Sequence, residues 1–177
     1  MGFITVLFFM LMIVANIVIY KRHHIKFNDT ENERKETYPL SFPTRLFEKA
    51  KYFLYLGVMV HLVSFACQKG DGTPSIPQFL TGAIMGMAGV WVLYASLKTL
   101  GVNFSPCNKG YLPEERVKTG PYRYMDHPIY YANMMQMAGV LVAVPGILMM
   151  GIFSVFVIFI YFAIKDEENA FRTYFKE

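Results

Sequence analysis

Residues 129–164 read IYYANMMQMAGVLVAVPGILMMGIFSVFVIFIYFAI, and this almost unbroken apolar stretch decides the fold. As a single helix it would have about 35 residues, far more than the roughly 20 that cross a bilayer. Pro145-Gly146 near its middle is a turn signal. We therefore predict two membrane-spanning helices, 129–144 and 147–164, joined by a tight turn.

Three further apolar runs lie upstream, at 2–20, about 52–67 and about 76–97. The first lacks the basic region and cleavage site of a secretory signal, so we expect it to be a retained helix. The second is short, and we expect it to extend back through Leu46 and Phe47 as an amphipathic helix in the interface. Only 17% of the chain is charged, against about 25% in soluble domains. The prediction is an all-α polytopic membrane protein with about five transmembrane helices, forming one domain over residues 1–177.

The basic residues predict the orientation in the membrane. Sixteen of the 17 Lys and Arg side chains lie in 21–51, 98–123 and 165–176, whereas only Lys69 lies between the second and third runs. Basic residues favour the cytoplasmic side, so the N-terminus is expected outside and the C-terminus in the cytoplasm. Residues 28–37 are polar and are expected to form a cytoplasmic loop. Because the charges flank apolar runs, the net charge of +4 does not indicate a nucleic-acid partner.

Small residues and cysteines indicate packing rather than chemistry. Gly82, Gly86 and Gly89 recur at a spacing that lets helix backbones approach closely in lipid. Cys67 and Cys107 are the two cysteines, and they fall in different segments between helices. This pattern excludes a disulfide framework and a cysteine metal site.

The segment 116–131, RVKTGPYRYMDHPIYY, has more chemical character than a connecting loop needs. Gly120-Pro121 turns the chain, and His127 is bracketed by four tyrosines, Tyr122, Tyr124, Tyr130 and Tyr131. One interpretation is an aromatic belt at the membrane interface with snorkelling basic residues. The other is a binding site that offers aromatic faces, phenol donors, an imidazole and cations.

A second segment, Lys165-Asp-Glu-Glu-Asn169, follows the last apolar run. A solvated helix end is the ordinary explanation, although acidic groups at a helix C-terminus oppose the macrodipole. If the two segments fold together, Glu167 and Glu168 face His127 and the tyrosines across one cytoplasmic cup. Such a cup suits a zwitterionic ligand. Its carboxylates would bind an ammonium group, its cations and phenols would bind a carboxylate group, and its aromatic faces would contact a sulfonium.

The string GPYRYMDHPIY at 120–130, followed by a Glu pair at the end of the last helix, resembles the isoprenylcysteine carboxyl methyltransferase family. That family is related to phospholipid N-methyltransferases and membrane sterol reductases. The resemblance covers about residues 116–174. The chain departs from the pattern at Asp126 and Ala163, where the family usually has arginines; Arg123 or Lys165 are the candidate replacements.

The resemblance implies an S-adenosylmethionine-dependent enzyme without a metal, whose cofactor is held by segments 102–131 and 165–177. Glu167 would bind the ammonium group of the cofactor, and the residues around His127 would bind the cofactor's amino-acid end. Glu168 would be the general base for an amine or thiol acceptor. The full set of implied cofactor-binding residues is Lys118, Gly120, Tyr122, Tyr124, His127, Pro128, Tyr130, Tyr131 and Glu167.

The short loops leave little soluble mass for a second large ligand, so we expect a lipophilic or amphiphilic acceptor. It would enter from the bilayer through a gap between helices, with residues such as Tyr55 or Ala132 at its edge. Two alternatives remain open from the residues. One is a nicotinamide-dependent reductase of the sterol type, and the other is a non-catalytic scaffold or heme-handling membrane protein.

Overall fold

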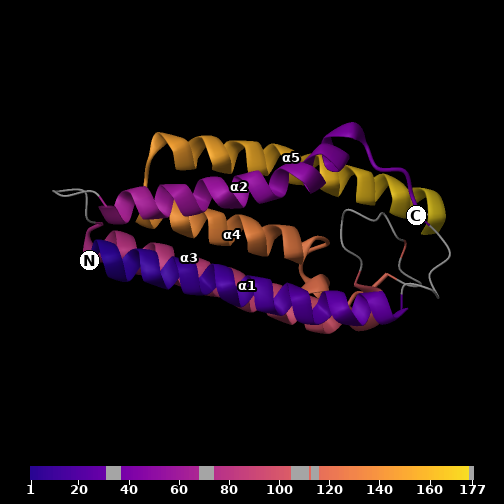
Figure 1. Ribbon diagram of the computed structural model, residues 1–177. Coiled ribbons are helices and arrows are strands. Elements are labelled where there is room, and N and C mark those ends of the chain that lie inside the picture. Colours follow the sequence, from indigo (N-terminus) through magenta and orange to yellow (C-terminus); the bar gives the residue numbers. More distant parts are fainter. Residues whose placement is uncertain (31–36, 68–73, 105–111, 113–115, 176–177) are drawn as a thin grey trace.

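A computed structural model describes residues 1–30, 37–67, 74–104, 112 and 116–175. The described chain forms five long α-helices, which confirms the predicted all-α architecture (Figure 1). They are α1 (Gly2–Thr30), α2 (Phe42–Cys67), α3 (Ile76–Leu100), α4 (Pro128–Ala143) and α5 (Ile147–Phe175), with short 3₁₀ turns η2 (Gly101–Asn103) and η3 (Gly120–Arg123).

Four helices are long and apolar enough to cross a membrane: α1, α2, α3 and α5. The fourth predicted span is α4, whose 16 residues extend only about 24 Å, short of a hydrocarbon core of about 30 Å. α3 and α5 nevertheless run in the same direction, and α4 returns the chain between them (Figure 1). The protein is a multi-pass integral membrane protein, and large apolar side chains such as Phe3, Phe53 and Ile147 are exposed on its outside.

α4 lies between two pairs of helices, α1 with α3 and α2 with α5 (Figure 1). α1 runs parallel to α3, since the Phe8 ring lies 5.8 Å from that of Phe79 and Met12 lies against Gly86. α2 runs antiparallel to α5, and the ring of Phe47 stacks on that of Phe159 at 5.2 Å. Consecutive helices therefore alternate in direction, and the segments before α2, after α3 and after α5 lie at one end.

Close packing of α3 on α4 depends on glycines, as the sequence predicts. A Cβ added at Gly82 would lie 2.5 Å from the backbone oxygen of Gly139, and one added at Gly139 would lie 2.6 Å from the oxygen of Gly82. Gly89 packs in the same way on the backbone of Ala132. The two helices thus touch through their backbones, which fixes the start of α4 relative to the end of α3.

Two helix ends differ from the predictions, and a third agrees. α1 continues to Thr30, so the predicted loop at 28–37 begins later, and its residues 31–36 lie outside the described residues. α2 begins at Phe42 and includes Leu46 and Phe47, as predicted. α5 continues to Phe175, so the acidic run is inside the helix and not at its end. Ala170 is buried, and this burial stabilises the last turns of α5. Hydropathy alone does not reveal it.

Candidate active site

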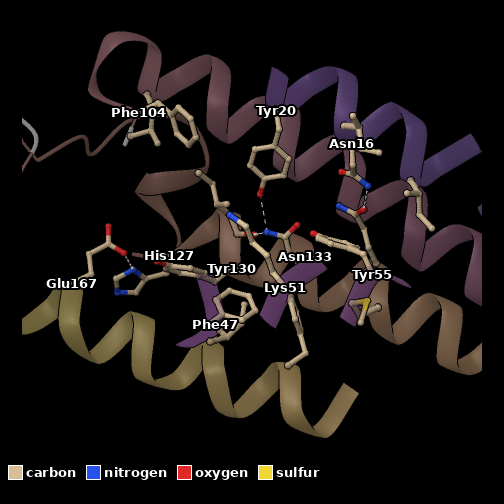
Figure 2. Close-up of a pocket in the computed structure, with 18 of the residues that line it drawn as sticks. Asn16, Tyr20, Phe47, Lys51, Tyr55, Phe104, His127, Tyr130, Asn133 and Glu167 are labelled. Atoms are coloured by element: carbon tan, nitrogen blue, oxygen red, sulfur yellow. Dashed lines mark hydrogen bonds and ion pairs between the residues drawn. The ribbon is translucent and has the colours of Figure 1, made fainter. Parts of the chain in front are cut away.

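A pocket of about 1180 Å³ lies within the bundle (Figure 2). Its lining comes from all five helices, from η3 and from the segment around Arg116. Charged and aromatic side chains line the end near η3, and methionine, valine, isoleucine and leucine side chains line the rest. The pocket therefore joins a polar end to an apolar interior.

The turn η3 is fixed to the end of α3. Gly120 has φ of +56°, a left-handed conformation that favours glycine. A Cβ at this position would lie 2.5 Å from Oγ1 of Thr99. Pro121 follows as the second residue of the turn. This docking directs Tyr122 into the pocket, where it is one of the lining residues.

His127 is buried at the polar end of the pocket, next to α5 (Figure 2). It is the N-cap residue of α4, and Pro128 begins the helix, as the fixed φ of proline favours. Its Nδ1 lies 3.4 Å from Oε2 of Glu167, and its Nε2 lies 3.6 Å from Oε1 of Glu168. Among the described residues Nε2 has no hydrogen-bond partner. The two segments thus fold together around His127 as expected.

The electrostatic environment favours the charged form of His127 and the neutral form of Tyr122. Burial lowers the pKa of His127, but Glu167, Glu168 and Asp126 outweigh burial and raise it above its ordinary value. Burial raises the pKa of the Tyr122 phenol, and the nearby Glu167 and Tyr20 raise it further. The pocket end thus favours an imidazolium beside the Glu167 carboxylate, together with a phenol that keeps its proton.

A cation that the sequence analysis did not single out, Arg116, also lines the pocket. Its guanidinium lies 3.0 Å from Oδ1 of Asp126 and 5.7 Å from the ring centroid of Phe171. Asp126 stands where the family that the sequence resembles usually has an arginine. The neighbouring Arg116 places a guanidinium next to that position. Of the two expected replacements, Arg123 lines the pocket and Lys165 does not.

The candidate residues divide into two groups. Lining the pocket are Lys118, Tyr122, His127, Tyr130 and Glu167. The other five do not line it: Gly120 and Pro128 shape the backbone, Tyr124 and Tyr131 are exposed, and Glu168 is about half exposed.

The two residues expected at a lateral gap also differ. Tyr55 lines the pocket and is exposed to the outside. Ala132 is fully buried against Gly89, so its placement at the edge of a gap was wrong. The exposed apolar and aromatic lining residues instead lie on α1 and α2, at Val14, Ile17, Tyr52, Tyr55 and Leu56.

The interior of the pocket contains polar residues that the sequence analysis passed over. Nδ2 of Asn133 donates to the hydroxyl of Tyr20 at 2.9 Å, and Asn16 donates to Gln136. These residues could have been identified as amide side chains inside apolar runs, because polar residues within membrane-spanning segments usually belong to functional sites.

The bundle and its pocket fit a membrane enzyme that brings a polar ligand and a lipophilic one together, and the comparison with protein families specifies the class. The model of the phospholipid methyltransferase family matches residues 77–177. The chain belongs to this family, and the protein is a membrane methyltransferase. No curated protein and no solved structure matches the chain. The match is to the broad family and not to the isoprenylcysteine subfamily, and it favours methyl transfer over the reductase and scaffold alternatives.

Proposed function

We propose that the protein transfers a methyl group from S-adenosylmethionine to a lipophilic or amphiphilic acceptor that enters from the bilayer. The observation that carries the proposal is the continuity of one pocket. It contains the His127–Glu167 pair at one end and reaches exposed residues of α1 and α2 at its side. A water-soluble donor and a membrane-soluble acceptor then meet inside one cavity. Its volume of about 1180 Å³ exceeds the roughly 300–1,000 Å³ of a site for one drug-sized ligand.

The residues at the polar end fit the amino-acid part of this cofactor. Nε2 of the buried His127 has no hydrogen-bond partner among the residues that the structure describes. A charged imidazole, with Arg116 and Lys118 in the same lining, would bind the carboxylate. Glu167 would bind the ammonium, and Tyr122 and Tyr130 would contact the cofactor along the pocket wall. Gly120 and Pro128 would hold the backbone turns, with Tyr124 and Tyr131 at the outer edge.

The bound cofactor would supply an activated methyl group for an in-line displacement that requires no metal and no covalent enzyme intermediate. The protein's contribution is then position, because a fixed reacting geometry contributes up to about 7–11 kcal/mol. An amine or thiol acceptor also loses a proton. We assign this proton to Glu168, whose half-exposed carboxylate lies beside His127 and outside the pocket lining, so the proton would reach it through bound water. A carboxylate acceptor would need no base.

The acceptor class follows from the apolar part of the pocket and from the family. A phospholipid amine is the first candidate because the matched family acts on phospholipids by name. An isoprenylcysteine-like carboxylate and a lipophilic thiol are the other members of the class. The walls formed by α1 and α2 precede the matched residues 77–177, so selection among these acceptors would depend on features of this chain outside the match.

Cofactor binding provides the direct test. Purified protein in nanodiscs should bind S-adenosylmethionine, and His127→Ala and Glu167→Gln should each weaken binding about ten- to a hundredfold, as expected for loss of a charge-assisted contact. Thr173→Ala is the control, since Thr173 is exposed on the same helix and, among the described residues, its side chain bonds only to Asn169 of that helix. Tight NADPH binding without S-adenosylmethionine binding would instead indicate a reductase.

We also propose that the pocket's polar end faces the cytoplasm, from the distribution of basic residues. Cys67, at the opposite end of α2, is exposed and reports the other side; Cys107 lies outside the described residues. In oriented vesicles an impermeant thiol reagent should label Cys107 from the cytoplasmic side only and Cys67 from the outside only. The reverse labelling pattern would show that the protein has the opposite orientation in the membrane.

A further inference from the structure

Two uncharged amide side chains meet inside the membrane-spanning part of the bundle. Asn16 belongs to the span Gly2–His23 of α1, and Gln136 belongs to α4. Nδ2 of Asn16 donates to Oε1 of Gln136 and, at 3.1 Å, to the backbone oxygen of Met12. The Met12 oxygen can only accept, so it fixes the orientation of the Asn16 amide. The contact with Gln136 in turn fixes the Gln136 amide.

This orientation leaves one donor group and one acceptor without partners. Within the described part of the chain, neither Nε2 of Gln136 nor Oδ1 of Asn16 has a hydrogen-bond partner, and both atoms are buried. The Gln136 residue is only 5% exposed. A buried amide nitrogen without a partner costs about 1–3 kcal/mol. Such an arrangement is unfavourable by itself, and a ligand that completes it would relieve the cost.

Both side chains line the pocket described above, at a defined depth. Gln136 follows His127 by nine residues on the same helix, which corresponds to about 13 Å along α4. Figure 2 shows Asn16 at the far end of the view from His127 and Glu167. Nearby on α1, Val14 and Ile17 line the pocket and are exposed to the outside. The amide pair therefore lies beside the apolar opening and away from the charged end.

We propose that the Asn16–Gln136 pair is a recognition subsite for a neutral hydrogen-bonding group in the acceptor, with Nε2 of Gln136 donating to an ester or amide carbonyl below the methylated head. This inference rests on the proposed function, and it restricts the acceptor to amphiphiles that carry such a group at the base of their apolar chains. A glycerolipid with acyl esters meets this requirement. A simple hydrocarbon chain on a polar head does not.

The chemistry of the pair separates this subsite from the cofactor end. Neither member of the pair is charged, so the pair itself suits a neutral hydrogen-bonding group. The charged groups that suit a zwitterionic cofactor, His127 and Glu167, lie at the other end of the cavity. The lining around the pair includes Met12, Met137 and Val140, which suits an acyl chain.

The test compares two lipids that differ only in their carbonyl groups. Diacyl phosphatidylethanolamine and its dialkyl ether analogue, with equal chain lengths, are offered together to detergent-purified protein, and the retained lipids are measured by native mass spectrometry. The wild-type protein should retain the ester lipid about three- to tenfold better, the effect of one hydrogen bond. Gln136→Met, which keeps the length but removes the amide, should abolish the preference. Met135→Leu, a change on the same helix at a residue that does not line the pocket, should preserve it.

Equal retention of the two lipids by the wild-type protein, or retention of neither, overturns the subsite, and this result does not depend on whether any variant folds. A preference that survives in Gln136→Met also overturns it. Transfer of a labelled methyl group from S-adenosylmethionine is measured in parallel. A clear ester preference without methyl transfer would defeat the proposed function and leave the lipid subsite standing.

Discussion

Asp166 of α5 caps the N-terminus of α2 at Ser41. Its Oδ2 accepts a hydrogen bond from the Ser41 backbone N–H at 2.9 Å and another from the Ser41 hydroxyl at 2.8 Å. The hydroxyl of Thr44 donates to the same oxygen at 2.6 Å. A carboxylate at a helix N-terminus is favourable because it satisfies free donors and complements the helix dipole. Asp166 thus faces α2, whereas the next two acids, Glu167 and Glu168, both face His127.

Asp166→Ala should lower the free energy of unfolding by about 1–3 kcal/mol, because the donors at the start of α2 lose a charged acceptor. Unfolding in detergent, followed by heating or denaturant, measures the change. Asp126→Ala is the control, since the Asp126 side chain is 70% exposed and its pair with Arg116 contributes at most about 1 kcal/mol. Equal destabilisation by the two variants would show that Asp166 does not hold α2.

Gly82→Ala should destabilise the bundle by about 1–3 kcal/mol, because the new methyl group meets the backbone oxygen of Gly139 and the helices must separate. Gly151 provides a matched control on α5, where a Cβ has nothing within 4 Å among the described residues. Gly151→Ala should be neutral or stabilising by about 0.5–1 kcal/mol. Thermal unfolding of the two variants in the same detergent tests the prediction, and a stable Gly82→Ala protein would contradict direct backbone contact.

The helical architecture was predictable because apolar runs and turn signals are local properties. Pro145-Gly146 separates α4 from α5 in the structure as the sequence predicts. Helix ends were less predictable, since α5 extends to Phe175 through tertiary contacts. α4 has the predicted length of 16 residues, because His127-Pro128 begins it and the chain leaves the helix before Pro145.

The polar end of the site was also predictable in part, because its residues form two short strings. His127 and Glu167 meet as the strings suggest. The place of Arg116 in the site and the Asn16–Gln136 contact were not predictable, because both depend on which helix faces lie together. Ala132 was misplaced for the same reason: no periodicity reveals that its face of α4 packs on Gly89.

The ion pair of His127 predicts a pH dependence. The carboxylates around it raise the pKa of His127 above the ordinary value of 6.5. A raised pKa in the folded state contributes stability that is fully present below the unfolded pKa, and this stability is lost as pH rises through the folded pKa. The melting temperature should therefore fall as pH rises above about 6.5. His127→Gln should flatten this part of the profile, and an unchanged slope would show that another group titrates there.

The lateral opening between α1 and α2 predicts a selective effect on the acceptor. Ile17 lines the pocket and is 59% exposed, whereas its neighbour Val18 is 58% exposed and does not line the pocket. Ile17→Trp places a large ring in the opening, and Val18→Trp places the same ring on the outside of α1. Because the opening is distant from the His127–Glu167 end, affinity for S-adenosylmethionine should change by less than about threefold in both variants.

Kinetics with a lipid acceptor in nanodiscs separate the two variants. Ile17→Trp should raise the KM for the lipid about tenfold, the effect of about 1.4 kcal/mol of lost binding, or stop turnover. Val18→Trp should leave the KM close to that of the wild-type protein, because lipid already surrounds that position. If both variants raise the KM equally, the ring perturbs α1 and does not block a route. If neither does, the acceptor reaches the pocket by another path, and the cofactor-binding results for His127 and Glu167 would still decide whether the protein uses S-adenosylmethionine.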